Sequence, residues 1–300
     1  MLVLRALGLG DLLTGVPALR GLRRLHPGRP LVLAGPPGVG GWLRDLGVVD
    51  AVLPTAGLDG PPPGADLGPH DAVDLHGNGW PSHDLLLRAS PRSLLALALP
   101  GETHGPQWRA DEHEVDRWCR LVRSAGGDCG REDLLLDVAL PPRSGHVVLH
   151  PGAASGSRRW PAGRWAQVAR ALADRGADVR LSGGADEVGL CAGIAAAAGL
   201  PDSASTAGTL GLPGLAELVG TAGLLVCGDT GVAHLATALG TPSVLLFGPV
   251  SPAAWGPAVD EHLHRVLWHG DGTGDPHGSE PDPALLRITA DEVLDAVTQL

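Results

Sequence analysis

The chain is poor in aromatic residues other than tryptophan. Its 300 residues include no Tyr, one Phe and eight Trp. A core with so few rings must be mainly aliphatic, and 44% of the residues are hydrophobic against 18% charged. This balance is typical of a globular protein and argues against disorder. The length predicts about two domains.

Cysteines are few and scattered. The four, Cys119, Cys129, Cys191 and Cys227, form no C-x-x-C pair, so their spacing indicates neither a zinc site nor a disulfide framework. We expect reduced thiols, as in a cytoplasmic protein. No apolar run reaches the length of a membrane span. The first residues already have the pattern of a strand and its turn, so we expect no signal peptide.

Positive charge is also scarce. There are 22 Lys and Arg residues against 33 Asp and Glu, which gives a formal net charge of −11. This balance argues against nucleic acid as a partner, because phosphate backbones attract Lys and Arg. The cations gather locally, at Arg20, Arg23 and Arg24 and again at Arg158 and Arg159. Such clusters can bind one anionic ligand within an acidic protein.

Short apolar runs alternate with amphipathic stretches along the chain, a pattern typical of parallel sheets with crossover helices. Pro141 and Pro142, followed by Arg143-Ser144-Gly145, interrupt this alternation and indicate a linker. We therefore expect an α/β protein with two Rossmann-like domains, residues 1–141 and 142–300, that face one another across a cleft.

The apolar periodicity predicts the following elements. In the first domain we expect strands at 2–7, 31–34, 51–53, 72–75 and 94–99, an edge strand at 134–138, and helices at 11–25 and 113–124. In the second we expect strands at 146–150, 178–182, 224–227 and 243–247, and helices at 162–175, 186–198, 215–221, 232–239 and 289–300. Thr289 and Glu292 fit a capping box. Residues 58–69 and 269–283 are expected to be surface loops.

The turn after the first strand contains Gly8, Gly10 and Asp11. Two glycines at this place let backbone amides approach a ligand at the next helix N-terminus. A dinucleotide fingerprint needs a third glycine where Leu13 stands, which disfavours a plain NAD site. From this turn alone, Asp11 is either the N-cap of the next helix or a functional acid.

Two further turns carry charged residues in the second half. Small residues after His150 lead to Arg158 and Arg159, which form either a clamp for a diphosphate or a solvated basic loop. The turn from Gly183 to Glu187 ends in acids that either accept ribose hydroxyls or cap a helix.

A fourth turn contains Asp229, Thr230 and Gly231 at a predicted helix start. Helix N-termini carry partial positive charge and unpaired amides, so Thr230 and Gly231 can donate to phosphate. His234, one turn into the helix, can face the same site. The three turns of the second half follow parallel strands, whose carboxyl ends meet at one edge where ligands bind.

These motifs resemble glycosyltransferase family 9, the ADP-heptose:lipopolysaccharide heptosyltransferase family. The resemblance rests on residues 228–242, 246–249 and 255–257, on Gly10-Asp11 with Pro17-Ala18-Leu19, and on 150–152 with 158–161. It extends from near the first residue to about residue 257, although residues 55–140 contribute only their order.

The resemblance implies a GT-B fold, with the acceptor bound by the first domain and the nucleotide sugar by the second. It implies inverting transfer without a metal or cofactor, and it makes Asp11 the general base. The donor-binding residues that it implies are Gly10, Arg158, Arg159, Glu187, Asp229, Thr230, Gly231 and His234. Arg158 stands where the family usually has Lys, and Arg159 could share or take this role.

The partners implied are ADP-heptose or another nucleotide sugar, and a glycan or glycolipid acceptor, with peripheral contact at the inner membrane. Three other functions stay open. A nucleotide-sugar epimerase or hydrolase of the same fold would form product without an acceptor. A dinucleotide-dependent oxidoreductase is disfavoured by Leu13. A non-catalytic nucleotide-binding protein would bind a nucleoside diphosphate and turn nothing over.

Overall fold

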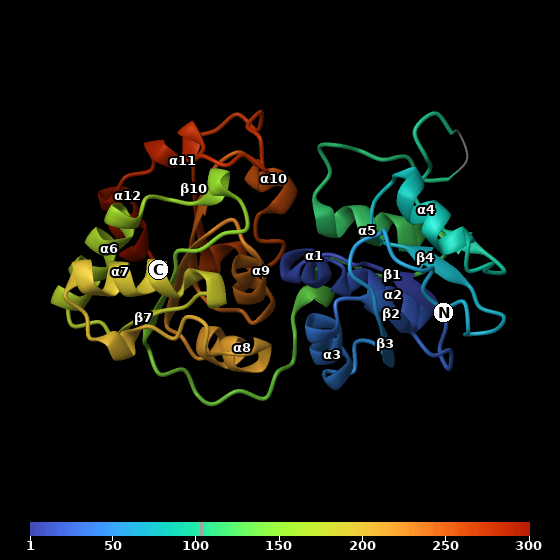
Figure 1. Ribbon diagram of the computed structural model, residues 1–300, viewed down its shortest axis with the longest axis horizontal. Coiled ribbons are helices and arrows are strands. Elements are labelled where there is room, and N and C mark those ends of the chain that lie inside the picture. Colours follow the sequence, from blue (N-terminus) through green and yellow to red (C-terminus); the bar gives the residue numbers. More distant parts are fainter. Residues whose placement is uncertain (103–104) are drawn as a thin grey trace. The chain divides into compact units, whose positions relative to one another are not determined.

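The computed structural model describes residues 1–102 and 105–300 (Figure 1). The chain divides into two compact units, Met1–Leu136 and Asp137–Leu300, each with its own sheet. The sequence predicted a boundary between residues 141 and 142, and the structure divides a few residues earlier. The segment after Leu136 belongs to the second unit because Ser144 N–H donates to the Thr221 carbonyl at 2.9 Å and Arg143 Nη2 donates to the Gly240 carbonyl.

The first unit is built on a five-stranded parallel sheet in the order β3-β2-β1-β4-β5. Its strands are β1 (Leu2–Leu4), β2 (Val32–Gly35), β3 (Ala51–Pro54), β4 (Ala72–Asp74) and β5 (Leu94–Leu95). In the register, Leu4 lies opposite both Ala34 and Asp74. The strand order reverses between β1 and β4, and ligands of open α/β sheets bind beyond the carboxyl ends of strands at such a reversal.

The helices of this unit are α1 (Leu9–Thr14), α2 (Val16–Leu25), α3 (Pro37–Asp45), α4 (Trp80–Leu87) and α5 (Glu114–Ser124). The helix predicted at 11–25 begins earlier, at Leu9, and is divided at Gly15. Gly15 makes room for a neighbour, since a Cβ there would lie 2.9 Å from Cδ of Arg5. The sequence analysis missed α3 and α4 because each has a proline in its first turn. A helix tolerates proline there, but in a sequence a proline usually indicates a turn.

The edge strand predicted at 134–138 is wrong. Within the described residues this stretch contains the end of a 3₁₀ turn, Arg131–Leu134, followed by irregular chain. Arg20 explains the difference, because its Nη1 donates hydrogen bonds to two backbone carbonyls of this stretch, that of Asp133 at 2.6 Å and that of Leu135 at 2.7 Å. Carbonyls that accept a hydrogen bond from the Arg20 side chain in this way do not pair with a neighbouring strand.

The second unit repeats the plan with the strand order β10-β9-β8-β6-β7. Its strands are β6 (Val147–His150), β7 (Val179–Leu181), β8 (Leu224–Gly228), β9 (Ser243–Phe247) and β10 (His264–Trp268). The helices are α6 (Ala162–Asp174), α7 (Val188–Ala198), α8 (Leu212–Gly220), α9 (Gly231–Ala238), α10 (Pro252–Trp255), α11 (Pro283–Arg287) and α12 (Ala290–Val297). The order reverses between β6 and β8, and β10 was not predicted.

Two groups of helices flank the second sheet. α6 contacts α7 and α12, whereas α8 contacts α9 (Figure 1). Alternate residues of the strands, such as Val147 and Leu149 of β6, point into the aliphatic core beneath α6, α7 and α12. The predicted capping box is confirmed, because Thr289 Oγ1 accepts from Glu292 N–H at 3.2 Å and Glu292 Oε2 accepts from Thr289 N–H at 2.7 Å.

The described helices include none that is both long and apolar enough to cross a membrane.

Candidate functional site

The turn after β1 places Asp11 inside the first turn of α1. Gly8 is the N-cap residue, and Asp11 is the third residue of the helix. The interpretation of Asp11 as an N-cap is therefore wrong. Its carboxylate lies back over the N-terminus, since Oδ2 is 3.6 Å from the position that a Cβ on Gly8 would take. The side chain is half-buried, and an acid here is stabilised by the helix dipole.

A fully buried arginine supports this turn. Arg5 Nη2 donates to Thr14 Oγ1 and to Glu114 Oε1, each at 3.1 Å. Its other nitrogens donate to the backbone carbonyls of Asp11 and Leu75. One side chain thus connects the turn that carries Asp11 with the end of β4 and with the start of α5.

Glu114 balances the charge of Arg5 within the protein interior. It also accepts from Arg117 Nη1, and from Trp118 Nε1 at 2.6 Å. Burial alone would raise the pKa of Glu114, but the guanidinium groups of Arg5 and Arg117 hold it below its usual range. Glu114 is therefore ionised at neutral pH, and the turn rests on a fixed charged network.

The turn after β4 brings His76 to the same edge of the first sheet. Its ring Nδ1 accepts from Ala6 N–H at 3.2 Å, and its backbone N–H donates to Asp74 Oδ1 at 2.8 Å. Burial, together with the charge of Arg5, lowers the pKa of His76 to about 4. The ring is therefore neutral at physiological pH. Because Nδ1 accepts, the proton is on Nε2.

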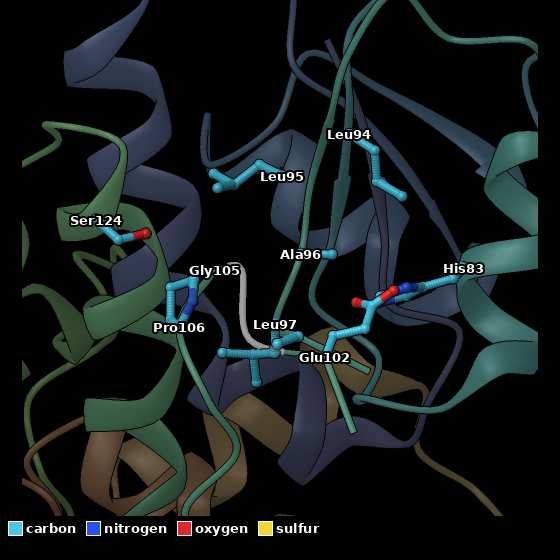
Figure 2. Close-up of a pocket in the computed structure, with 10 residues that line it drawn as sticks. His83, Leu94, Leu95, Ala96, Leu97, Glu102, Gly105, Pro106 and Ser124 are labelled. Atoms are coloured by element: carbon cyan, nitrogen blue, oxygen red, sulfur yellow. The ribbon is translucent and has the colours of Figure 1, made fainter. Parts of the chain in front are cut away.

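A cavity of about 590 Å³ lies beside β5 in the first unit. Figure 2 shows its lining, in which His83, Glu102 and Ser124 stand among the apolar residues 94–98. His83 Nε2 lies 3.5 Å from Oδ2 of Asp74, a buried carboxyl whose pKa burial raises. The lining contains none of the residues that the sequence assigned to catalysis or donor binding.

In the second unit, the structure brings Arg158 and Asp229 together. Arg158 Nη1 lies 3.7 Å from Asp229 Oδ2, a long ion pair that leaves 25% of the arginine side chain exposed. Asp229 is buried, and its backbone N–H donates to the Leu246 carbonyl at 3.1 Å. Gly228 permits the approach, since a Cβ there would lie 3.2 Å from the Arg158 carbonyl oxygen. The turns after β6 and β8 therefore meet where the strand order reverses.

Arg159 binds a backbone carbonyl. Its Nε donates to the Ala153 carbonyl at 3.0 Å, and its side chain is exposed. The predicted surface loop at 269–283 packs on this turn, since Ser155 Oγ donates to the Pro276 carbonyl at 2.7 Å. The loop thus holds the chain that leads to Arg158.

Glu187 joins the turns after β7 and β6. Its Oε2 accepts from Gly184 N–H at 2.7 Å, which is the capping contact that the sequence left open. Its carboxylate also lies against Gly152, where an added Cβ would overlap it. Beside it, burial lowers the pKa of His150 while the charge of Glu187 opposes this shift. His150 Nδ1 is hydrogen-bonded to Ser182 Oγ at 3.0 Å.

The remaining predicted residues lie at the start of α9, apart from Gly10. Thr230 is the N-cap of α9 but its side chain makes no capping bond, and Gly231 is the first helical residue. His234 is buried and packs edge-on against Trp255, with ring centroids 5.9 Å apart. Gly10 is the second residue of α1 and belongs to the other unit, Met1–Leu136.

Sequence reasoning missed the residues that support Asp11. The available signal was an arginine directly after the apolar run Leu2–Leu4, where a charged residue needs a partner. That partner, Glu114, is 109 residues away, and nothing in the spacing connects the two. His76 likewise gave no motif.

The chain has two Rossmann-like units, each with polar residues at its strand-order reversal, which is the architecture of the GT-B fold class. A family model described as glycosyltransferase family 9 (heptosyltransferase) matches residues 103–270, more than half of the chain. The chain belongs to this family, as its motifs predicted.

The relatives are lipopolysaccharide heptosyltransferases. Heptosyltransferase 1 of Pseudomonas aeruginosa is 32% identical over 190 residues, which cover 59% of this chain and 51% of that protein. Heptosyltransferase 2 of Salmonella typhimurium is 31% identical over 244 residues, which cover 77% of this chain and 65% of that protein. In the first of these matches the chain spans about half the length of its relative.

Solved structures show the same fold. A glycosyltransferase family 9 protein from Veillonella parvula superposes with a TM-score of 0.80 at 18% identity, covering 99% of this chain and 95% of that one. The Escherichia coli heptosyltransferase WaaC, solved with ADP, gives 0.73 at 21% identity, covering 99% and 98%. The predicted GT-B class is confirmed.

Proposed function

We propose that this protein transfers a sugar, heptose or a related one, from a nucleoside-diphosphate sugar to a hydroxyl group of a glycan or glycolipid. One observation carries the proposal above all: the Arg158–Asp229 pair stands beside the N-terminus of α9, at the strand-order reversal of the second sheet. Arginine and helix amides are the groups that bind a diphosphate. The names of the relatives support heptose as the sugar.

In this proposal Asp11 is the general base of an inverting transfer. The acceptor oxygen attacks the anomeric carbon, the bond from that carbon to the diphosphate oxygen breaks, and Asp11 takes the hydroxyl proton. Its place at the reversal between β1 and β4, on a turn fixed by buried Arg5, supports this role. The acceptor binds the first unit, and a glycolipid acceptor would bring the protein to the inner face of the inner membrane.

The leaving diphosphate is stabilised by Arg158 and by the amides at Thr230 and Gly231, without a metal or cofactor. We assign this role to Arg158 because Arg159 is bound to the Ala153 carbonyl. Glu187 and His234 complete the donor site, Glu187 toward the nucleoside. Gly10 contributes its backbone at the turn of Asp11.

The test is an assay of the full chain with ADP-heptose and a deacylated lipopolysaccharide core oligosaccharide. We expect ADP release to depend on the oligosaccharide, to continue in EDTA, and to give a product of inverted anomeric configuration by NMR. ADP release at the same rate without the oligosaccharide would identify a hydrolase instead. Loss of turnover in EDTA that Mg²⁺ restores would contradict metal independence.

A further inference from the structure

The half-buried ring of His76 offers a hydrogen-bond donor whose direction is fixed. Nδ1 is engaged by Ala6 N–H at 3.2 Å, and the backbone is engaged by Asp74 Oδ1 at 2.8 Å. Both partners lie at the carboxyl-terminal end of the sheet. Asp74 is the last residue of β4, and Ala6 lies in the turn after β1. Among residues 1–102 and 105–300, the structure gives Nε2 no hydrogen-bond partner.

The surroundings of the ring keep it uncharged. Arg5 donates to the carbonyl of Leu75, the residue before His76, and burial together with the charge of Arg5 lowers the pKa of His76 to about 4. Asp74 faces the backbone of His76, and burial raises the pKa of its carboxyl. A neutral N–H donor suits an uncharged oxygen acceptor, such as a sugar hydroxyl, because neither group loses the strong hydration of an ion.

An exposed indole follows in the same turn. Trp80 is the first residue of α4 and is 60% exposed, although most large apolar side chains of the first unit are buried. A sugar ring has one face of C–H groups and an edge of hydroxyl groups. An exposed aromatic ring four residues after a fixed N–H donor, on the same connection from β4 to α4, supplies a partner for each part of such a ring.

We propose that the turn from His76 to Trp80 binds the acceptor sugar, with His76 Nε2–H donating to an uncharged oxygen of that sugar and Trp80 packing on its apolar face. This inference rests on the proposed function, because it needs a glycan acceptor in the first unit. Its chemistry is specific to a neutral hydroxylated ring, and it assigns His76 to substrate binding and leaves proton removal to Asp11.

Two substitutions separate substrate binding from a structural role. In His76→Asn, the amide oxygen can replace Nδ1 as the partner of Ala6 N–H, but nothing reaches the position of Nε2. In His76→Gln, the longer amide can donate from near the position of Nε2, but the contact with Ala6 is lost. Our proposal predicts that kcat/KM for the oligosaccharide falls about 10-fold in His76→Asn, the value of one lost hydrogen bond, and largely recovers in His76→Gln. KM for ADP-heptose should not change in either variant.

A structural role predicts the reverse order, with His76→Asn normal and His76→Gln impaired, and that result would overturn the inference. The second readout is NMR of the full chain with ¹⁵N-labelled histidine, in which we expect the Nε2–H tautomer and a shift of the His76 signal on addition of the deacylated core oligosaccharide. A shift without sugar transfer would refute the proposed function and retain the binding site. Transfer with no shift and normal His76→Asn would refute the binding site alone, and absence of both would refute both.

Discussion

At the scale of single residues, the position of Asp11 changes what a substitution can test. As the third residue of α1 behind the N-cap Gly8, Asp11 is not needed to start the helix. Asp11→Asn removes the charge and keeps the size. We expect a loss of stability no larger than the helix-dipole contribution of about 0.3–1 kcal/mol. ADP binding should be unchanged, and kcat should fall about 100-fold or more, the range of a general base.

The control for Asp11→Asn is Asp84→Asn, which removes an exposed carboxylate in an i,i+4 pair with Arg88 on α4. It should leave turnover unchanged. Near-normal turnover of Asp11→Asn itself would remove Asp11 from the mechanism and direct the search to another acid in the first unit.

Trp80 gives a second prediction at this scale. Because Trp80 is 60% exposed, Trp80→Ala should cost little stability, in contrast to a buried ring such as Trp118. We expect KM for the oligosaccharide to rise about 5-fold, since an aromatic contact of this size is worth about 1 kcal/mol. Leu87→Ala is the matched control, because Leu87 is 47% exposed on the same helix. If both variants raise KM equally, the effect is not that of a specific stacking contact.

At the scale of elements, α5 is tied to the turn of Asp11 through Glu114. Glu114→Gln removes the counter-charge of two buried guanidinium groups, those of Arg5 and Arg117. Breaking a buried ion pair typically costs about 3–5 kcal/mol, so the free energy of unfolding in urea at pH 7 should fall by about that amount. Asp84→Asn, in an exposed pair, should cost about 0–1 kcal/mol.

The ion pairs of Glu114 also predict how the free energy of unfolding depends on pH. The folded pKa of Glu114 is below its ordinary value of 4.5, so its ionisation stabilises the fold above that pH. The stabilisation is lost as the pH falls through the lower, folded pKa. The difference in unfolding free energy between the wild type and Glu114→Gln should therefore narrow on acidification below about pH 4.5. A difference that widens on acidification would contradict an ionised Glu114.

The sequence predicted elements well where the apolar pattern alone decides them. The uniformly buried strands β6, β8 and β9 lie where continuous apolar runs placed them. β10 was missed because it begins with His264 and Arg265, which leave only a short apolar run. The contact that holds the buried His264 ring, between Nδ1 and Ser243 Oγ at 2.8 Å, forms only in the fold. The turns that carry Asp11, Arg158 and Asp229 were found because local glycines mark them. The network of Arg5 and Glu114 was not, since contacts between distant residues leave no local pattern.

At the scale of the whole molecule, the two units have parallel sheets of the same plan, yet their reversal points carry opposite chemistry. The first has the Asp11 carboxylate and the neutral His76 ring, which suit a hydroxyl acceptor. The second has Arg158 and the start of α9, which suit a diphosphate. Under the proposed function each unit binds one substrate, so substitutions in one unit should leave binding to the other unchanged.

ADP binding to the full chain tests the assignment of the nucleotide sugar to the second unit. At about 100 times its Kd, ADP should stabilise the wild type and Asp11→Asn by about 2.7 kcal/mol, because a ligand of the folded state shifts unfolding by mass action. At the same ADP concentration Arg158→Gln should show clearly less stabilisation, since it loses a charged contact with the diphosphate. Arg159→Gln is the matched control, and we expect it to behave as the wild type because Arg159 is held by the Ala153 carbonyl. EDTA should not change any of these shifts. Stabilisation that disappears in Asp11→Asn but persists in Arg158→Gln would place the nucleotide in the first unit and reverse the assignment of the two substrates.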